Sequence, residues 1–404
     1  MRFAGNRAVS LQVATLGSGM FLGQLLTAGI YLIAARGTDP AAFGRVVAAI
    51  GVGLLAISLL EFGTNTLWLR ELAAGRIGVD EYGTRLTGKI AVNLIVGLFS
   101  FAILSAQHFG TAVLLTVPYC FSIQLATAIN VGNRAAGLPH RIGWFTVADR
   151  LTAVVMLLVL MGIGVPAEVA MMIGLTLGGF TNAVISFFCM PVQFRPRFRF
   201  SRGNPWKGTG AFGAFGIATS VQSLDVTVLA VAGGAASAGL YGAVTRWTQP
   251  MMLLASAVAQ VLAPLIAASS SNRAAIQKAF QQAWVLCLAV TGCIGVAFFA
   301  PTLVSLLLGE EYADSGTVLR LLAIATIPAV MNQPLIALLQ LRGLQRAVAI
   351  SWGLVALGQV AMIAITAGTY GALAAAYSSL FAQTILFVVL GGLSATKLKG
   401  QTPM

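Results

Sequence analysis

Residues 223–250 read SLDVTVLAVAGGAASAGLYGAVTRWTQP. Two apolar runs flank the small-residue turn GGAASAG (233–239), and each run carries one charge, Asp225 before the turn and Arg246 after it. Charges are scarce throughout, since 9% of the 404 residues are charged and 58% are hydrophobic, whereas an ordinary soluble domain is about 25% charged. The mean hydropathy is +0.89. We therefore predict that this stretch is two helices in a lipid bilayer.

Similar apolar runs recur along the whole chain. A helix of about 20 residues, rising 1.5 Å per residue, crosses about 30 Å of hydrocarbon. The runs do not alternate apolar and polar residues, which excludes a transmembrane barrel. The sequence predicts an all-α polytopic membrane protein with twelve spans. They are expected near residues 11–35, 46–69, 88–107, 111–133, 142–164, 168–192, 208–232, 239–267, 281–308, 317–340, 348–367 and 371–395.

The positions of the basic residues test this count, because cytoplasmic loops are enriched in Lys and Arg. With the N-terminus inside, most of the 24 basic residues fall in inner loops or tails, including Lys89 and the cluster at 195–207. Near the outer surface lie Arg36 and Arg45, and an acidic cluster at 310–314. We therefore predict that both termini are cytoplasmic.

The net charge of +13 and the pI of 10.3 suggest nucleic acid in a soluble protein. The stretch FRPRFRFSRG (194–203) also interleaves aromatics with arginines. Here it lies in an inner loop, where retention of the loop and attraction to anionic head groups explain it better. Nucleic acid is not an expected partner.

Catalytic and metal-site patterns are missing from the sequence. Cys120, Cys189, Cys287 and Cys293 lie in apolar runs without paired spacing or neighbouring histidines. The segment GEEYADSG (309–316) lacks the lysine of a phosphate loop. A membrane glycosyltransferase or ligase would need catalytic groups on long outer loops, and the predicted outer loops are short. We expect a transporter with no cofactor, driven by an H⁺ or Na⁺ gradient.

Two echoes relate the halves of the chain. IAARGTDPAAFGRV (33–46) and VAGGAASAGLYGAV (231–244) both place an aromatic-glycine pair after a small-residue turn, and NRAAGLPHRIGW (133–144) is echoed by QLRGLQRAVAISW (340–352). Both echoes preserve order, which indicates two six-helix lobes of the same orientation. The predicted domains are an N-lobe (1–192), a basic cytoplasmic linker (193–207) and a C-lobe (208–404). Chance recurrence of such pairs at helix ends is the alternative.

Three segments resemble Wzx-type polysaccharide flippases of the MOP superfamily: LEFGTNTLWLRELA (60–73), SLDVTVLAVAGGAASAGLYGAV (223–244) and LLLGEEYADSGTVLRLLAIATIPAVMNQPLIALLQLRGLQR (306–346). The resemblance implies a V-shaped alternating-access transporter in the bacterial inner membrane. It also implies export of a polyprenyl-pyrophosphate-linked oligosaccharide to the outer leaflet for O-antigen, capsule or exopolysaccharide synthesis. Partners would be membrane lipids and the polysaccharide polymerase and chain-length machinery. MATE-like drug or cation antiporters share the superfamily and are the alternative.

Asp225 and Arg246 are the leading candidate site residues. They lie at similar distances from the turn, and hence about 15 Å below the outer surface. A charge at that depth costs several kcal/mol unless it is paired or faces water. The two residues are expected either to pair and fix spans seven and eight, or to act in transport. In the second case Arg246 binds a phosphate or an acidic sugar, and Asp225 holds it or exchanges protons.

Further charges fit a cationic cavity, each with a structural alternative. Arg150 faces the cavity or is neutralised by Asp149, and Arg320 faces it or pairs with Asp314 or Glu311. Glu61 is a candidate for ion coupling. Arg36 and Arg45 line a cationic exit or anchor the outer turn. The polar residues expected to form hydrogen bonds with sugar hydroxyls are Gln222, Gln260, Asn332 and Gln340. The prolines expected at helix hinges are Pro250, Pro264, Pro328 and Pro334.

Overall fold

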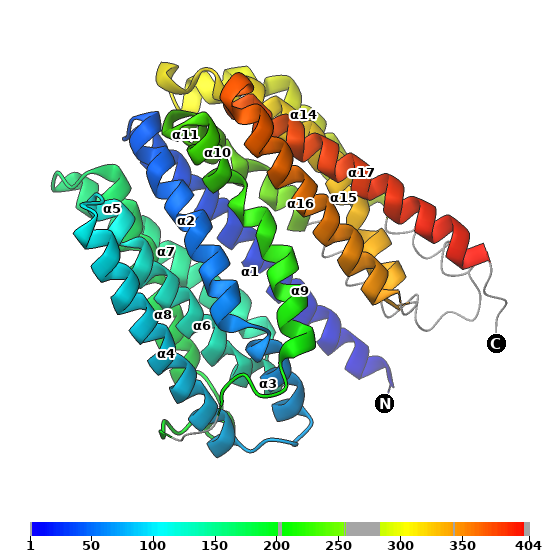
Figure 1. The fold of residues 1–404 in the computed structure, drawn as a ribbon. Helices are drawn as coiled ribbons and strands as arrows, with labels where there is room; N and C mark the ends of the chain where they lie inside the picture. The colour runs from blue at the N-terminus through cyan, green and yellow to red at the C-terminus, as the bar shows by residue number, and fades with distance from the viewer. Residues whose placement is uncertain (1, 201–203, 254, 256–282, 342–343, 400–404) are drawn as a thin grey trace. The chain divides into compact units, whose positions relative to one another are not determined.

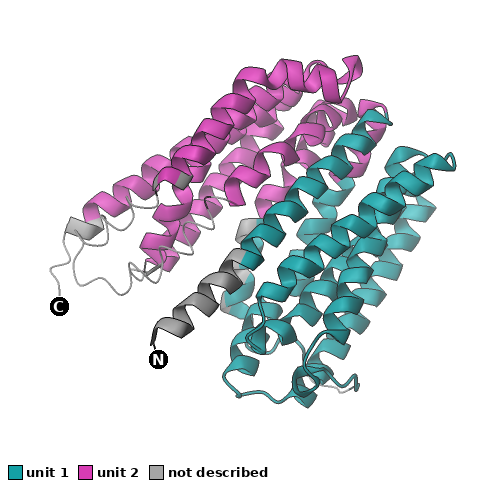
Figure 2. Ribbon diagram, turned by 180° about the vertical axis from the view of Figure 1, so that it is seen from behind, with its two compact units in different colours: residues 1–38, 49–220 teal, residues 39–48, 221–404 magenta. Residues whose placement is uncertain are grey.

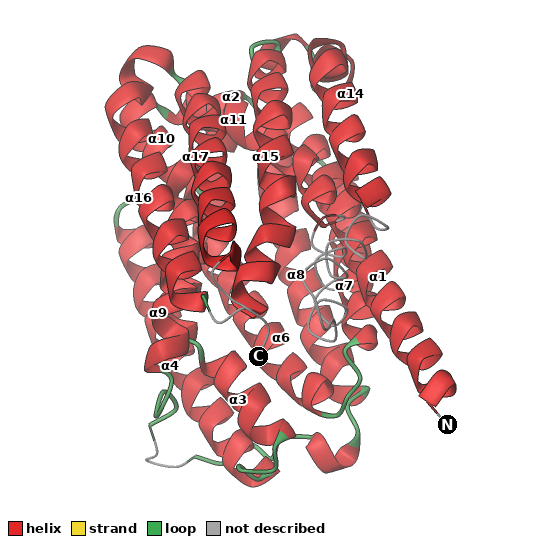
Figure 3. Cartoon of the chain, turned by 90° about the vertical axis from the view of Figure 1, so that its right-hand side faces the viewer, coloured by secondary structure: helices red, strands yellow, loops and turns green. Residues whose placement is uncertain are grey.

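The structure, a computed structural model, describes residues 2–399 except 201–203, 254, 256–282 and 342–343. The described chain is helical, with short connections and no strand (Figure 1, Figure 3). Its long helices are α1 (Arg2–Arg36), α2 (Pro40–Glu61), α4 (Val79–Ala106), α6 (Thr116–Ala135), α7 (His140–Gly162), α8 (Ala167–Phe188), α14 (Ala283–Leu307), α15 (Ser315–Leu341), α16 (Gln345–Tyr370) and α17 (Ala372–Lys399). Shorter elements are α3 (Thr64–Ala73), α5 (Thr111–Leu114), η1 (Val192–Phe194), α9 (Gly210–Ser220), η2 (Val221–Leu224), α10 (Asp225–Gly233), α11 (Ala235–Thr245), η3 (Arg246–Thr248) and η4 (Glu310–Tyr312).

Within the described ranges, 10 helical segments are long and apolar enough to cross a membrane. They correspond to the spans predicted before residue 193 and to the last four predicted spans. Predicted span seven consists of the shorter helices α9 and α10, joined by η2. Predicted span eight begins as α11 and η3 and continues into residues outside the described ranges. The predicted all-α polytopic membrane fold is confirmed.

The predicted boundaries of span two, 46–69, are wrong because the chain breaks at Glu61. One carboxylate oxygen of Glu61 accepts the backbone N–H of Gly63 at 2.8 Å, and the other accepts that of Asn65 at 2.7 Å. The carboxylate thus satisfies N–H groups at the start of α3 that lack helical partners. Gly63 has φ of 74°, and a Cβ there would lie 2.5 Å from Cβ of Phe212 on α9. Glycine therefore allows both the turn and the close approach of α9.

The chain divides into two compact units, coloured in Figure 2. Unit 1 contains residues 1–38 and 49–220, and unit 2 contains residues 39–48 and 221–404. The start of α2 therefore groups with the second unit, whereas α9 groups with the first. In unit 1, α7 packs against α1 and α8, and α6 packs against α8 and α3. In unit 2, α15 packs against α14 and α17, and α16 packs against α17 and α10.

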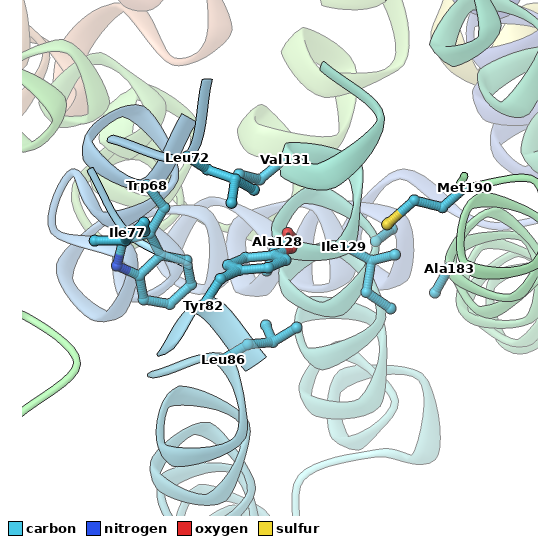
Figure 4. Packing of buried hydrophobic residues seen from close by; sticks show 11 residues of the cluster. Trp68, Leu72, Ile77, Tyr82, Leu86, Ala128, Ile129, Val131, Ala183 and Met190 are labelled. Atoms are coloured by element: carbon cyan, nitrogen blue, oxygen red, sulfur yellow. Dashed lines mark hydrogen bonds between the residues drawn. The ribbon is translucent and has the colours of Figure 1, made fainter. Parts of the chain in front are cut away.

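A buried cluster joins α3, α4, α6 and α8 at one end of unit 1 (Figure 4). The Trp68 and Tyr82 rings meet edge to face with centroids 5.9 Å apart. Both side chains are fully buried, and the Tyr82 hydroxyl donates to the carbonyl of Ala128 at 2.7 Å. Aromatic burial with a satisfied hydroxyl fixes α4 on α6. The same cluster includes Met190, which follows α8.

Within unit 2, the start of α2 and the start of α11 cross at two glycines. A Cβ on Gly44 would overlap the carbonyl oxygen of Ala235, and a Cβ on Gly239 would overlap that of Pro40. Each glycine thus lets its helix rest on the backbone of the other. Gly44 belongs to the aromatic-glycine pair Phe43-Gly44 noted in the sequence. The close contact with Ala235 explains why this position needs a glycine.

Candidate functional site

The Asp225 carboxylate lies at the beginning of α10, where η2 ends. One oxygen accepts the hydroxyl of Tyr241 at 2.9 Å, and the other accepts the N–H of Val226 at 2.7 Å. Arg246 starts η3 directly after α11 and interacts electrostatically with both Asp225 and Tyr241. The structure therefore brings the two predicted charges into one electrostatic group. Tyr241, which sequence reasoning assigned only to the repeat, provides the hydrogen bond at its centre.

Amide side chains lie in the same unit. Gln222 donates to the Gln359 side chain at 3.2 Å, and buried Asn332 donates to the side chain and the backbone carbonyl of Gln383, both at 3.2 Å. Asn332 is thus committed to α17. Of the other predicted polar and hinge residues, Gln260 and Pro264 lie outside the described residues, whereas Pro328 and Pro334 lie inside α15.

Asp149 and Arg150 form the polar centre of unit 1. The Arg150 guanidinium lies 3.7 Å from the Asp149 carboxylate, with side chains 17% and 9% exposed. Arg150 also interacts electrostatically with Tyr119 and Tyr31, while its Nη1 atom is buried without a hydrogen-bond partner. Arg150 therefore pairs with Asp149 and forms a hydrogen bond with Tyr119, while its buried Nη1 atom keeps unused donor capacity.

The Asp149 carboxylate continues into a buried polar chain between α6, α7 and α8. Asn182 donates to Asp149 at 3.5 Å, and Asn130 donates to Asn182 at 3.3 Å. Ser186 then donates to the Asn130 side chain at 2.8 Å. Sequence reasoning missed this chain. Its signal was the presence of Asn182 and Ser186 four residues apart in a span, which places them on one helix face.

Lys89 was assigned to an inner loop, and that prediction is wrong. Because α4 begins at Val79, Lys89 lies within the helix and is 1% exposed. Its ammonium donates to Thr64 Oγ1 at 2.6 Å and to Asn65 Oδ1 at 3.1 Å, and lies 5.2 Å from the Trp68 ring centroid. It also interacts electrostatically with Glu61. Both Glu61 and Lys89 therefore stabilise the break between α2 and α3. Glu61 accepts backbone N–H groups there, and Lys89 donates to side chains at the start of α3.

The other predicted cations are exposed. Arg36 ends α1, and Arg45 lies in the second turn of α2. Arg320 Nε donates to the carbonyl of Ala297 on α14 at 3.3 Å. Among the described residues, Arg320 forms no ion pair with Asp314 or Glu311. Its hydrogen bond instead links α15 to α14.

Two further features bear on possible ligands. A groove of about 400 Å³ runs between α16 and α17, lined mainly by apolar side chains such as Leu354, Phe381 and Ile385. Gln359 and Ser378 are its buried polar residues. Within the described ranges, no group of three or more His, Cys, Asp or Glu residues is placed to hold a metal ion.

Comparison with known proteins gives one family and a set of related folds. The model of the family described as "Polysaccharide biosynthesis protein" matches residues 33–317. No curated protein matches the sequence.

Solved structures share the fold at low identity. The lipid II flippase MurJ in an inward closed conformation superposes with a TM-score of 0.76 and 13% identity, covering 95% of this chain and 87% of MurJ. An inward-facing multidrug resistance MATE transporter of the MOP superfamily gives 0.60 and 18%, covering 96% of each chain. The Vibrio cholerae MATE transporter VcmN, solved as a point mutant, gives 0.57 and 15%, covering 98% of this chain and 99% of VcmN. The described chain therefore has the fold of MOP transporters.

Proposed function

Because this chain belongs to the polysaccharide biosynthesis protein family, we propose that it is a flippase for a polyprenyl-pyrophosphate-linked oligosaccharide. It would carry this lipid from the inner to the outer leaflet of the bacterial inner membrane, for O-antigen, capsule or exopolysaccharide synthesis. Both termini would be cytoplasmic. The polymerase and chain-length machinery would receive the product.

The observation that carries the proposal is the family match, which spans most of the chain from residue 33 to residue 317. The charge pattern supports it. A lipid pyrophosphate carries at least two negative charges that cannot enter hydrocarbon without compensation. Arg150 and Arg246 lie within apolar helical segments, one in each unit, and a guanidinium matches phosphate oxygens with two parallel donors.

In this proposal Arg246 is the first contact for the pyrophosphate. Its neighbours Asp225 and Tyr241 hold it in place while it is empty, and the incoming anion competes with the Asp225 carboxylate for the guanidinium. Arg150 contributes the donor edge that Asp149 leaves unused. Arg320, Arg36 and Arg45 are exposed, which suits guiding the anion along its path.

Gradient coupling is assigned to Asp225, with Glu61 as the second candidate. Protonation or Na⁺ binding at Asp225 would weaken its attraction to Arg246 and so link ion movement to release of the anion. At Glu61, protonation would weaken the cap on α3 and the interaction with Lys89. Protonation is expected to have different effects at the two residues. At Asp225 it would promote release of the anion, and at Glu61 it would weaken the break between α2 and α3.

A MATE-like antiporter for small molecules or cations is the second candidate function, favoured by the shared fold. A deletion strain separates the two, with polyprenyl-linked lipids extracted and identified by mass spectrometry. Accumulation of a polyprenyl-pyrophosphate oligosaccharide on the cytoplasmic side supports the flippase and identifies its cargo. An unchanged lipid-linked pool together with new drug sensitivity rejects it in favour of the antiporter.

A further inference from the structure

The segment after α8 forms a basic strap, residues 192–200, which comprises η1 and the non-helical residues that follow it. Its first anchor is Arg195. Nη2 of Arg195 donates to the carbonyl oxygens of Phe188 at 3.0 Å and Met190 at 3.3 Å. The guanidinium carbon lies 5.3 Å from the centroid of the Phe187 ring. Arg195 therefore closes the C-terminal end of α8, where carbonyl groups lack helical partners.

The second anchor of the strap is the beginning of α4. A Cβ on Gly83 would overlap the carbonyl oxygen of Arg197, so the strap backbone lies directly on this helix. The Arg197 guanidinium lies 3.7 Å from the Asp80 carboxylate, in an exposed pair. The Phe198 ring stacks on Phe187 with centroids 5.8 Å apart. The strap is thus seated on α4 and α8 of unit 1.

Despite these anchors, the strap leaves large apolar side chains exposed. Phe198 is 51% exposed and Phe200 is 82% exposed. Phe188, the last residue of a candidate membrane span, is 67% exposed. Because Phe198 stacks on Phe187 in the last turn of that candidate span, we expect these rings near the boundary between hydrocarbon and head groups. In segments that lie at the membrane surface, Phe side chains enter the boundary between head groups and acyl chains.

The charges around these rings have one predominant sign. Arg197 and Arg199 are exposed, and Arg141 at the start of α7 donates to the carbonyl of Cys189 at 2.7 Å. Of the two acidic residues in the first turn of α4, Asp80 pairs with Arg197 and Glu81 pairs with Arg85. Clusters of basic residues immediately beyond a membrane span attract anionic lipids, and arginine forms paired hydrogen bonds with phosphate.

We propose that the basic strap and the adjoining ends of α7 and α8 form a binding surface for the head groups of anionic phospholipids. The exposed arginines contact the phosphates, and Phe188, Phe198 and Phe200 enter the boundary between head groups and acyl chains. Arg195 is a positioning residue that holds the strap in place. The proposal involves neither Arg246 nor the cargo, so its test does not depend on the proposed function.

The test is native mass spectrometry of the purified full-length protein with equimolar phosphatidylglycerol and phosphatidylcholine. The wild type is expected to retain phosphatidylglycerol preferentially, and salt is expected to weaken the preference. Arg197→Gln and Arg199→Gln are each expected to lower the preference about fivefold, and the double variant more than tenfold. Arg76→Gln is the matched control, since Arg76 is an exposed arginine of unit 1 that pairs with Glu71.

The aromatic part of the surface has its own variant. Phe198→Ala combined with Phe200→Ala is expected to lower retention of both lipids to a similar degree, because acyl contact does not depend on head-group charge. Thermal unfolding checks that each variant is folded. If the double arginine variant does not fold, Arg199→Gln alone decides, since Arg199 has no partner among the described residues.

Three outcomes overturn the proposal. One is a folded Arg199→Gln or double variant that keeps the wild-type preference. Another is an equal loss of preference in Arg76→Gln. The third is competition by millimolar inorganic phosphate that removes phosphatidylglycerol completely, which would indicate a simple anion site and not a lipid surface.

Discussion

The hydroxyl of Tyr241 donates a hydrogen bond of 2.9 Å to the carboxylate of Asp225, which links α11 to the beginning of α10. Arg246, on the next turn after α11, interacts electrostatically with both groups. A carboxylate within apolar helices thus has a neutral donor and a cation near it. In the proposed function, an anion bound at Arg246 would therefore change the electrostatic environment of the Asp225 carboxylate.

Asp225→Asn is expected to abolish the pH dependence of translocation, because the amide cannot exchange a proton in the working range. Transport of lipid-linked substrate into proteoliposomes, measured between pH 6 and 8, tests this. Tyr241→Phe is the control that keeps the carboxylate. It is expected to retain pH dependence while losing about 1–3 kcal/mol of stability, the cost of removing a hydrogen bond to a charged group. A pH profile that is unchanged in Asp225→Asn removes this residue from the coupling.

Arg246→Gln is expected to reduce translocation at least tenfold, since a paired phosphate contact contributes about 1.5–3 kcal/mol. Arg246→Lys is expected to restore part of the rate, because it keeps the charge and loses the planar fork. Initial rates at saturating and limiting lipid separate binding from movement. Arg346→Gln, an exposed arginine on α16, is the matched control, and an equal loss in both variants would argue against a specific contact.

Gly44→Ala and Gly239→Ala are each expected to destabilise the protein by about 1–3 kcal/mol or more, because each Cβ overlaps a backbone carbonyl of the neighbouring helix. Gly358→Ala is the matched control, since a Cβ there meets nothing within 4 Å. It is expected to be neutral or slightly stabilising, as alanine favours a helix over glycine. Thermal unfolding in detergent measures all three, and equal melting temperatures would contradict the contact.

Lys89→Met is expected to cost about 2–3 kcal/mol, because Thr64 and Asn65 lose hydrogen bonds to a charged group. The methionine retains much of the volume, which limits any effect of a cavity. Lys207→Met, at an exposed position, is the control and is expected to change stability by less than about 0.5 kcal/mol. A similar small change in Lys89→Met would show that the buried ammonium contributes no net stability.

Tyr312 gives a pH-dependent prediction outside the membrane spans. Burial raises the pKa of its phenol, and the nearby carboxylates of Asp39 and Glu311 add to the effect. The stability that this group contributes is complete below its unfolded pKa of about 10 and is lost as the pH rises above that value. Between pH 9 and 11 the wild type should therefore lose stability relative to Tyr312→Phe, and parallel melting curves would disprove this.

The fold could be predicted from the sequence because a helix that crosses a bilayer needs about 20 consecutive apolar residues. Runs such as residues 88–107 and 142–164 predicted helices that the structure contains. The helix break at Glu61 could not be predicted, because it depends on hydrogen bonds that the Glu61 carboxylate accepts from the backbone N–H groups of Gly63 and Asn65. Lys89 was counted with the inner-loop cations although it lies at the edge of the predicted span 88–107. Helix α4 begins earlier, at Val79, and the side chains around Trp68 bury Lys89 inside the protein.

The charged site was only partly readable. Spacing from the turn at 233–239 placed Asp225 and Arg246 at a common depth, and the structure joins them electrostatically. The role of Tyr241 required three-dimensional information, because a tyrosine in an apolar run is equally compatible with packing. The polar chain from Asp149 through Asn182 to Asn130 depends on three helices whose rotations the apolar sequence does not specify.

The division into units has a consequence for how force passes along the chain. The backbone changes unit near residues 38, 48 and 220. The second crossing lies inside α2, and the third lies where α9 meets η2. At these two places the covalent tether is helical, and a helix resists twisting and bending far more than a glycine-rich linker does. The covalent connections between the units at α2 and at the α9–η2 junction are therefore stiffer than a glycine-rich linker would be.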